Sequence, residues 1–471
     1  MSAVSPIAVD RADPRPLYRQ IYARVRASIE SGALRPGDRL PSARTLASDL
    51  GAARGTVEEA YGLLAAEGYV VRRGPGGSVI APGLQKAPAV RRSTTSKAPP
   101  FVRNIPMPDR PLPFAGGLPA LDAFPRKLWA RLVARQGRAL VDTAMAYPDA
   151  GGHPPLREAV ARYLTLSRGI ACSPEQVLIT GGYQSALDLV ARVVLRPGDK
   201  VWFEEPGYFI ARKALEAMAV RLVPVRVDGE GLRVAEGVAR APEARLAIVT
   251  PAHQSPLGVS LSLARRLALL TWAADRNAWI LEDDYDGEFH YAGRPLPALK
   301  SIDRAQRVLY AGSFSKVLYP GLRLGYLVVP DQLQPAFLAA SHLRDAGQAT
   351  FGQAVVARFI EEGHFVRHLK RMRALYVARR GALAEALGKV FGDRLAIEVP
   401  TGGLHLLAGL DGAIDDIELS RRAREAGLSP PALSLFATAR PRRQGLLLGF
   451  TNIPENKALK LARQLARALD G

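Results

Sequence analysis

Lys316 is the residue whose surroundings most clearly suggest chemistry. It lies in GSFSKVLYPGLRLGY, with Ser313 three residues before it and Arg323 seven residues after it. A lysine amine can form a Schiff base with an aldehyde, and a hydroxyl and a guanidinium together suit a phosphate dianion. Because most lysines are only solvated charges, the hypothesis of a phosphate-bearing aldehyde cofactor at Lys316 depends on further residues.

A second candidate segment, ILEDDYDGEF, follows an apolar run and contains Asp283 and Tyr285. Residues two apart in an extended segment lie on one side of it. An aspartate buried next to a pyridine nitrogen keeps that nitrogen protonated and makes the ring an electron sink, and a phenol can donate to the ring oxygen. A solvated acidic loop or a cation site is the alternative, but no histidines stand at metal-ligand spacing, so no metal site is expected.

Two further segments favour the same cofactor. TGGYQSALDLV predicts a strand-to-helix turn, where the backbone N–H groups of Gly182, Tyr183 and Gln184 would hold an anion. In EEPGYFIARKAL, Tyr208 is a candidate to stack on an aromatic ring. Together with Lys316, these residues predict a site for pyridoxal 5'-phosphate (PLP).

The elements that must position these residues form an α/β domain over residues 114–471. Short apolar strands such as VLIT and KVWFEE alternate with amphipathic helices such as SALDLVARVVL, which is typical of a mainly parallel sheet flanked by helices. Residues 81–113 hold eight prolines and few apolar side chains, so we expect an extended linker there.

Residues 1–80 predict a different kind of domain, three helices and a two-stranded wing. An apolar stripe from Leu17 to Ile29 indicates a first helix that stops at Gly32. The second should run from an N-cap at Ser42 to Leu50, and the third from about Arg54 to Glu67, followed by the wing GYVVRRGPGGSVIA. This is a helix-turn-helix order, in which the third helix enters the major groove of DNA.

Charge alone supports DNA binding only weakly. The chain carries a formal net charge of +20, but residues 1–80 contain 11 Lys+Arg against 8 Asp+Glu. DNA binding is therefore predicted from individual arginines in the helix-turn-helix motif. Arg44 and Arg54 stand where a guanidinium could bind a phosphate or pair with guanine.

The segments PLYRQI, GALRPGDRLPSARTLASDLG, TVEEAY and AAEGYV resemble the GntR-type winged helix. The resemblance implies that double-stranded operator DNA is bound by Arg44, Arg54, Thr56 and the wing around Arg73 and Gly76. Two positions depart from the pattern, since Ala53 stands where a Ser or Thr is usual and Gly55 where a polar residue is usual.

Residues 114–471 resemble a fold-type I, class I aminotransferase with a small C-terminal α+β subdomain. The likeness extends to FPRKLW, AYPDAGGHPPLREAVARYL, TPAHQSPLG, RPLPALKSID and GLLLGF. Behind a GntR-type winged helix, this domain resembles the MocR/GabR-like regulators. The resemblance implies a homodimer with crossed, domain-swapped winged helices, in which Tyr147 reaches the cofactor phosphate of the opposite subunit.

The aminotransferase pattern has three departures. Ser255 stands where Asn is common, and Tyr183 where Ser or Thr is common, so that His253 or Gln254 would take over hydrogen bonds. Leu435 stands near the expected place of the arginine that binds a substrate carboxylate. Three arginines follow it as candidates for that role, Arg440, Arg442 and Arg443.

We therefore expect a PLP-dependent transcriptional regulator that senses an amine or amino-acid effector, or PLP itself, through aldimine exchange at Lys316. The alternatives are an active aminotransferase with an accessory DNA-binding domain, and a DNA-binding module whose large domain is empty. Physiological turnover is not expected, although a transaminase half-reaction remains open. The N-terminus has no signal-peptide pattern, no apolar run reaches about 18 residues, and Cys172 has no partner for a disulfide, so a cytoplasmic protein without membrane contact is expected.

Overall fold

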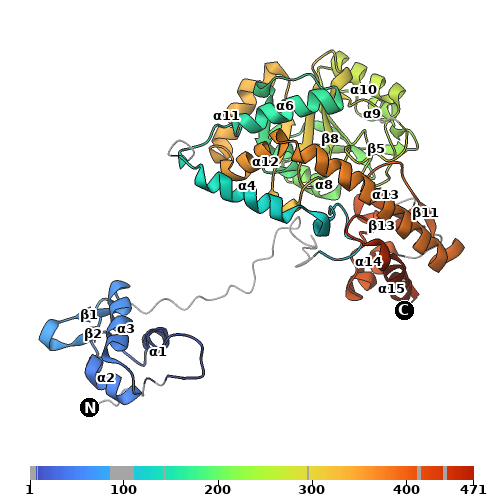
Figure 1. The fold of residues 1–471 in the computed structure, drawn as a ribbon. Helices are drawn as coiled ribbons and strands as arrows, with labels where there is room; N and C mark the ends of the chain where they lie inside the picture. Colours follow the sequence, from blue (N-terminus) through green and yellow to red (C-terminus); the bar gives the residue numbers. More distant parts are fainter. Residues whose placement is uncertain are drawn as a thin grey trace. The chain divides into compact units, whose positions relative to one another are not determined.

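The structure is a computed structural model that describes residue 7 and residues 9–84, 111–141, 145–293, 296–410, 415–438 and 443–470. The chain divides into two compact units, residues 1–98 and 99–471 (Figure 1). Most of the proline-rich segment 81–113, predicted to be an extended linker, lies outside the described residues. No helix in the described ranges is long and apolar enough to cross a membrane.

The small unit contains three helices and a hairpin. Its elements are α1 (Leu17–Glu30), α2 (Ala43–Leu50), α3 (Arg54–Ala66), β1 (Val70–Arg72) and β2 (Ser78–Ile80). The two strands pair antiparallel, with Val70 opposite Ile80, and form the predicted wing. The winged helix-turn-helix expected from the sequence is confirmed.

Local signals in the sequence fix the helix boundaries of this unit. The side chain of Ser42 accepts a hydrogen bond from the Thr45 backbone N–H at 3.1 Å, so the predicted N-cap of α2 is present. Gly51 ends α2 with a φ of 58°, a left-handed conformation that favours glycine. Ile21 and Val25 of α1 are fully buried in the core against α3, as the predicted stripe requires.

The large unit is built on an eight-stranded sheet within its described residues, in the order β3-β10-β9-β8-β7-β4-β5-β6. Strands β4, β5, β7, β8 and β9 run parallel, while β10 is antiparallel to both of its neighbours. The strands are β3 (Val177–Thr180), β4 (Lys200–Glu205), β5 (Arg221–Asp228), β6 (Gly231–Leu232), β7 (Leu246–Val249), β8 (Trp279–Asp284), β9 (Val308–Ser313) and β10 (Gly325–Val328).

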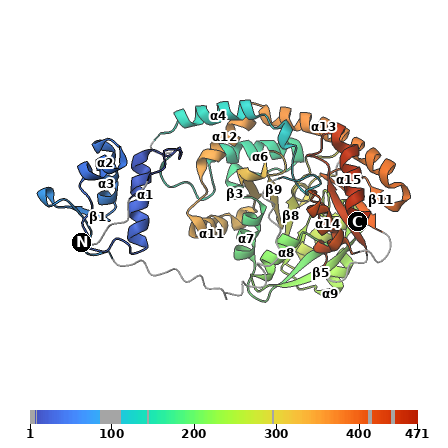
Figure 2. The same ribbon diagram turned by 90° about the horizontal axis from the view of Figure 1, so that it is seen from below.

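Helices cover both faces of this sheet, because alternate strand residues are apolar on both sides. Val177 and Ile179 of β3 pack on one face, whereas Leu178 packs on the other. Figure 2 shows β3, β8 and β9 between a layer with α6 and α12 and a layer with α7 and α8. The helices are α4 (Arg126–Arg138), α6 (Pro154–Arg168), α7 (Tyr183–Val194), α8 (Phe209–Glu216), α9 (Val234–Arg240), α10 (Leu263–Asp275), α11 (Gln334–Asp345) and α12 (Thr350–Glu361).

A smaller α+β part completes the large unit at its C-terminal end. The long helix α13 (His364–Phe391) packs on α15 (Ala458–Asp470), and an antiparallel sheet has the order β11-β12-β13 (Figure 1). Its remaining elements are β11 (Ala396–Glu398), β12 (His405–Leu410), α14 (Asp416–Glu425) and β13 (Gln444–Gly449). The predicted fold class, a mainly parallel α/β domain with a small α+β subdomain, is therefore confirmed.

The direction of the strands gathers the candidate residues at one edge of the large sheet. Asp283 and Ser313 lie at the carboxyl ends of β8 and β9, and Tyr208 follows the carboxyl end of β4. Because β10 runs the other way, its start next to Arg323 meets the same edge, where Gly325 pairs with Ser313. Ligands of open α/β sheets bind outside the carboxyl ends of the strands, which is where this set converges.

Candidate functional site

A cavity of about 570 Å³ opens at this edge of the sheet. Eight of the eleven residues predicted to contact the cofactor line it: Lys316, Asp283, Tyr285, Ser313, Arg323, Tyr183, Gln184 and Tyr208. They come from four separate segments of the chain. The structure thus brings together side chains that the sequence could link only by their expected chemistry.

Lys316 lines the cavity, and burial lowers the pKa of its amine, partly opposed by the carboxylates of Asp286 and Asp283. A lower pKa leaves more of the amine in the neutral form that attacks a carbonyl. Gly117 lies directly against this amine, since a Cβ at that position would be 2.5 Å from Nζ. A side chain at 117 would press on this amine, and the φ of 68° at Gly117 independently favours glycine.

Asp283 faces the cavity from the end of β8. Burial raises the pKa of its carboxyl well above the ordinary value, and the carboxylates of Asp284 and Asp286 add to this effect, while the Tyr183 phenol opposes it. A cationic partner, such as a protonated ring nitrogen, would stabilise the charged form of this buried carboxylate. The neighbouring Asp284 is used differently, because it pairs with Arg168 inside the fold.

The N-terminus of α7 and Arg323 form a place in the cavity that fits an anion. Gly182, with a φ of 97°, immediately precedes α7, and a Cβ there would be 3.7 Å from the Arg323 guanidinium. Among the described residues, Arg323 forms no ion pair and the buried Nε2 of Gln184 has no hydrogen-bond partner. Both side chains line the cavity together with Ser313 and Ser315. A helix N-terminus, a free guanidinium and hydroxyls are the groups that bind a phosphate dianion.

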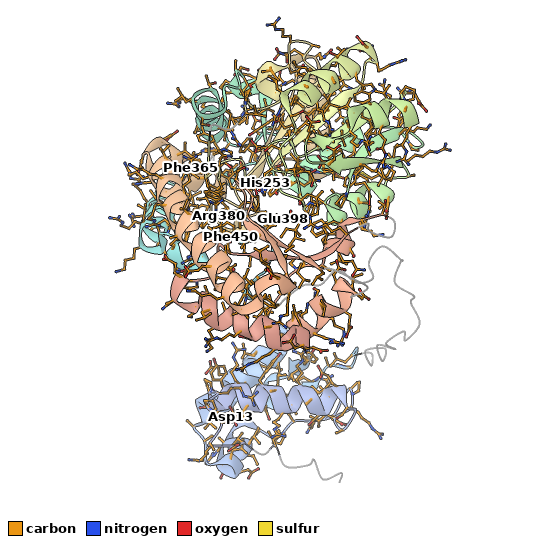
Figure 3. All side chains as sticks on the ribbon, turned by 90° about the vertical axis from the view of Figure 1, so that its right-hand side faces the viewer. Asp13, His253, Phe365, Arg380, Glu398 and Phe450 are labelled. Atoms are coloured by element: carbon orange, nitrogen blue, oxygen red, sulfur yellow. The ribbon has the colours of Figure 1, made fainter. Side chains whose placement is uncertain are left out.

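His253 does not line the cavity, although the sequence predicted that it contacts the cofactor. It lies behind Tyr285, in the interior of the large unit (Figure 3), with Nδ1 3.1 Å from the Tyr285 hydroxyl and 3.2 Å from an Asp286 carboxylate oxygen. Direct contact of His253 with the cofactor stays a prediction, and His253 is not among the residues that line the cavity. The imidazole instead orients the phenol that faces the cavity.

The close packing of Gly403 against His253 gives a testable expectation. Gly403 has a φ of 85°, and a Cβ there would overlap the His253 ring. Gly403→Ala should lower the free energy of unfolding by about 1–3 kcal/mol. Alanine is unfavourable in the left-handed backbone conformation, and its Cβ would clash with the His253 ring. Chemical denaturation measures this, with Gly388→Ala as a control, because nothing lies within 4 Å of a Cβ at 388. Equal stability of the Gly403 variant and the wild type would contradict the expectation.

Two other predicted residues lie outside the cavity lining. Gly182 adjoins Arg323 through its backbone, as described above. Tyr147 is 92% exposed and does not face the cavity of its own chain.

Of the three arginines considered for a substrate carboxylate, Arg443 pairs with Glu398 and does not line the cavity. The other two, Arg440 and Arg442, lie outside the described residues.

Several cavity residues were missed by sequence reasoning. Ser315 adjoins Lys316 and could have been found from that position alone, whereas nothing local marks His405 or Arg424. The lining also has an apolar part, which comprises Phe209, Ile210, Leu404, Pro431, Leu435, Phe436 and Leu447. Burial next to His253 lowers the pKa of His405 to about 4, so its imidazole is neutral near pH 7.

The predicted DNA-contacting residues lie on the surface of the small unit. Arg44 on α2 and Arg73 and Gly76 at the wing are exposed, and Thr56 on α3 is half-buried. Arg54 begins α3 with its side chain 70% exposed and forms an ion pair with Glu58 one turn later, at 2.8 Å. Ala53 gives α3 no side-chain cap.

Comparisons with known proteins agree with both units. Residues 17–80 match the family model described as bacterial regulatory proteins of the gntR family, and residues 124–439 match aminotransferase class I and II. The solved structure of LysN, an α-aminoadipate aminotransferase from Thermus thermophilus, superposes with a TM-score of 0.70 at 32% identity. The match covers 76% of this chain and 92% of that one, and the LysN structure contains N-(5'-phosphopyridoxyl)-L-leucine.

Two curated relatives extend over nearly the whole chain. The probable rhizopine catabolism regulatory protein MocR of Rhizobium meliloti is 38% identical, covering 95% of this chain and 92% of its own length. TauR of Rhodobacter capsulatus is 36% identical, covering 96% of both. These matches define a transcriptional regulator with a PLP-type aminotransferase domain. The chain belongs to the MocR-type GntR regulators.

PLP is the cofactor of this domain, and the cavity residues fit it. Lys316 would hold its aldehyde, Asp283 its ring nitrogen and Tyr285 its ring oxygen. The phosphate would be held at the α7 N-terminus by Arg323 and neighbouring hydroxyls. The unpaired Arg323 and the unpartnered Gln184 amide support this fit, because both need an anion or acceptor that the described residues do not provide.

Proposed function

We propose that this regulator senses a small molecule with a primary amine in the cavity around Lys316 and changes its binding to operator DNA in response. One observation carries the proposal: the buried Lys316 lines a cavity of about 570 Å³, in a chain that also carries a winged helix. When bound, PLP supplies an aldehyde that forms imines reversibly with primary amines.

Each cavity residue would have a separate role in such a sensor. Lys316 would hold the cofactor at rest and compete with the effector amine for it. Tyr285, held by His253, would hold the proton at the ring oxygen. Asp283 and Arg323 would keep the ring and phosphate in place while the effector binds. Effector binding in the cavity would affect the DNA-binding unit by favouring one of two conformations of the protein.

A crossed homodimer is part of this proposal. Tyr147 is almost fully exposed, which suits a residue that completes the phosphate site of a second subunit. Residues 81–113 would connect the winged helix to the large unit across the dimer. The effector itself, an amine or an amino acid, is proposed on the chemistry of Lys316.

A working aminotransferase is the second candidate, because Lys316 and Asp283 both line the cavity as catalysis would require. Multiple turnover with an amino donor and a keto acid would favour it over the sensor. A cofactor spectrum that changes once, without turnover, favours the sensor.

The test of the proposal is a spectral screen of amines and amino acids against the purified, PLP-loaded protein. Compounds that change the cofactor absorbance are then added to a DNA-binding assay at fixed salt concentration, with the upstream region of the gene as the probe. A compound that changes both the spectrum and the DNA affinity supports the proposal. Spectral changes that never alter DNA binding would contradict it.

Arg54→Ala should weaken specific DNA binding by about 1–3 kcal/mol if the guanidinium makes a bidentate base contact. Its position at the first residue of α3 and its exposure motivate this expectation. Fluorescence anisotropy at fixed salt, on specific and scrambled duplexes, measures the effect. Arg24→Ala on α1 is the matched control, since Arg24 is also exposed but lies outside the helix-turn-helix. Equal losses in the two variants would remove Arg54 from base recognition.

A further inference from the structure

Asp286 is a buried carboxylate that follows Tyr285 in the chain but does not line the cavity around Lys316. Its side chain is only 1% exposed. Among the described residues, His253 is the one basic side chain within ion-pair distance of it, with Nδ1 3.2 Å from a carboxylate oxygen. A buried carboxylate without a partner is strongly unfavourable, so the contact with this imidazole must compensate for its burial.

The same ring nitrogen also contacts Tyr285. Nδ1 of His253 lies 3.1 Å from the Tyr285 hydroxyl, so one nitrogen stands between a phenol and a carboxylate. A carboxylate can only accept a hydrogen bond, whereas a hydroxyl can accept or donate one. A proton on Nδ1 therefore suits both neighbours. A bare Nδ1 would face the carboxylate with its lone pair and would accept a hydrogen bond from the phenol.

The imidazole is closely packed in this position. A Cβ at Gly403 would overlap the ring, and a Cβ at Gly258 would be 3.1 Å from Nε2. Nε2 is buried and has no hydrogen-bond partner among the described residues. His253 also lines a separate cavity of about 30 Å³, together with Asp286 and His290, which has room for a water molecule. A water there would donate to Nε2, which is the acceptor nitrogen when Nδ1 carries the proton.

The other charged or titratable groups around His253 have partners of their own. Arg168 and Arg266 line the same small cavity, but Arg168 pairs with Asp284, and Arg266 donates to three backbone carbonyls at 2.6 to 2.8 Å. The ring centroid of His405 lies 5.7 Å from that of His253, and its Nε2 bonds a backbone carbonyl at 2.9 Å. The carboxylate next to Nδ1 is therefore the charged group placed to decide which nitrogen of His253 carries the proton.

We propose that Asp286 is a positioning residue whose carboxylate keeps the proton of His253 on Nδ1, so that Tyr285 keeps its own proton for the ring oxygen of PLP. Burial favours a protonated phenol as well, because it raises the pKa of Tyr285 well above the ordinary value, and the Asp286 carboxylate adds to this effect. The role goes beyond the proposed sensing function. It would hold for a sensor and for an aminotransferase alike, because both need Tyr285 to present a proton to PLP.

The first test identifies the protonated ring nitrogen in cofactor-free protein labelled with ¹⁵N-histidine. The ¹⁵N chemical shift distinguishes a protonated from a bare ring nitrogen, and the signals of His253 are those lost in His253→Gln. Near pH 7, Nδ1 should carry the proton in the wild type and in Tyr285→Phe. In Asp286→Leu, which has no acceptor, the proton should move to Nε2, because the phenol then donates to Nδ1.

Three results of this experiment would overturn the proposal. They are a bare Nδ1 in the wild type, an Nδ1 proton that survives in Asp286→Leu, and an Nδ1 proton that is lost in Tyr285→Phe. The first of these needs no substitution of Asp286, so the proposal stays falsifiable even where Asp286→Leu does not fold.

The second test follows the absorbance of the PLP-loaded protein against pH, with Asp286→Leu made in the wild type and in Tyr285→Phe. If Asp286 acts through the phenol, the shifts of the pH midpoint in the two backgrounds should differ by about one pH unit, since a hydrogen bond to a charged oxygen contributes about tenfold. Equal shifts would mean that its charge acts on Lys316 directly, and would overturn the positioning role. Asp275→Leu is the matched control, because it removes an exposed carboxylate at the end of α10 and should leave the midpoint unchanged.

Discussion

Lys316→Ala should abolish the covalent attachment of PLP that borohydride reduction traps in the wild type. Lys316 is the only lysine among the described residues that line the cavity, and burial lowers the pKa of its amine. Lys300 is also buried, but its amine donates a hydrogen bond to the Val308 carbonyl at 2.7 Å and does not line the cavity. No other described amine is therefore placed to replace it.

Mass spectrometry of reduced and digested protein measures this loss directly. The wild type should carry the PLP mass on the peptide that contains Lys316, and the variant should carry none. Lys213→Ala is the matched control, because Lys213 is an exposed lysine on α8 that pairs with Glu216 and should not affect the adduct. A full adduct on another lysine in the Lys316 variant would show that the site has been assigned wrongly.

Asp283→Asn should weaken PLP binding by about 1.5–3 kcal/mol, or roughly tenfold to a hundredfold, since it removes a charged hydrogen-bond partner of the ring nitrogen. Asp283→Glu keeps the negative charge and should lose less affinity for PLP. Equilibrium titration of the cofactor-free protein with PLP, followed by absorbance, measures both variants. Unchanged affinity in Asp283→Asn would exclude an ion pair between this residue and the ring.

The same substitution should affect the stability of the cofactor-free protein in the opposite direction. Burial holds the pKa of Asp283 well above its ordinary value, so the folded state favours the protonated carboxyl. That contribution to stability is complete below the unfolded pKa of about 4 and is lost as pH rises towards the folded pKa. Asparagine does not ionise, so cofactor-free Asp283→Asn should melt at a higher temperature than cofactor-free wild type at pH 7. The difference should shrink as the pH falls towards about 4.

Local patterns were sufficient to predict much of the fold. The runs VLIT and KVWFEE are strands β3 and β4, with the predicted ends, because each is a short apolar segment bounded by turn residues. Ser42 and Gly51 bound α2 as predicted, since a cap needs only a few consecutive residues. The eight predicted residues that line the cavity could be found for the same reason. They lie in short segments next to strand ends, and such a segment carries its own pattern.

Local sequence patterns predicted the two units and eight of the residues that line the cavity around Lys316. Packing between distant segments places His253 against the Tyr285 hydroxyl and leaves it outside the cavity lining. It alone placed His405 and Arg424 at the cavity, because β12 and α14 reach it through the packing of the C-terminal sheet. Contacts between segments more than a hundred residues apart leave no periodic signal in either segment, so this part of the cavity lining could not be predicted from local sequence.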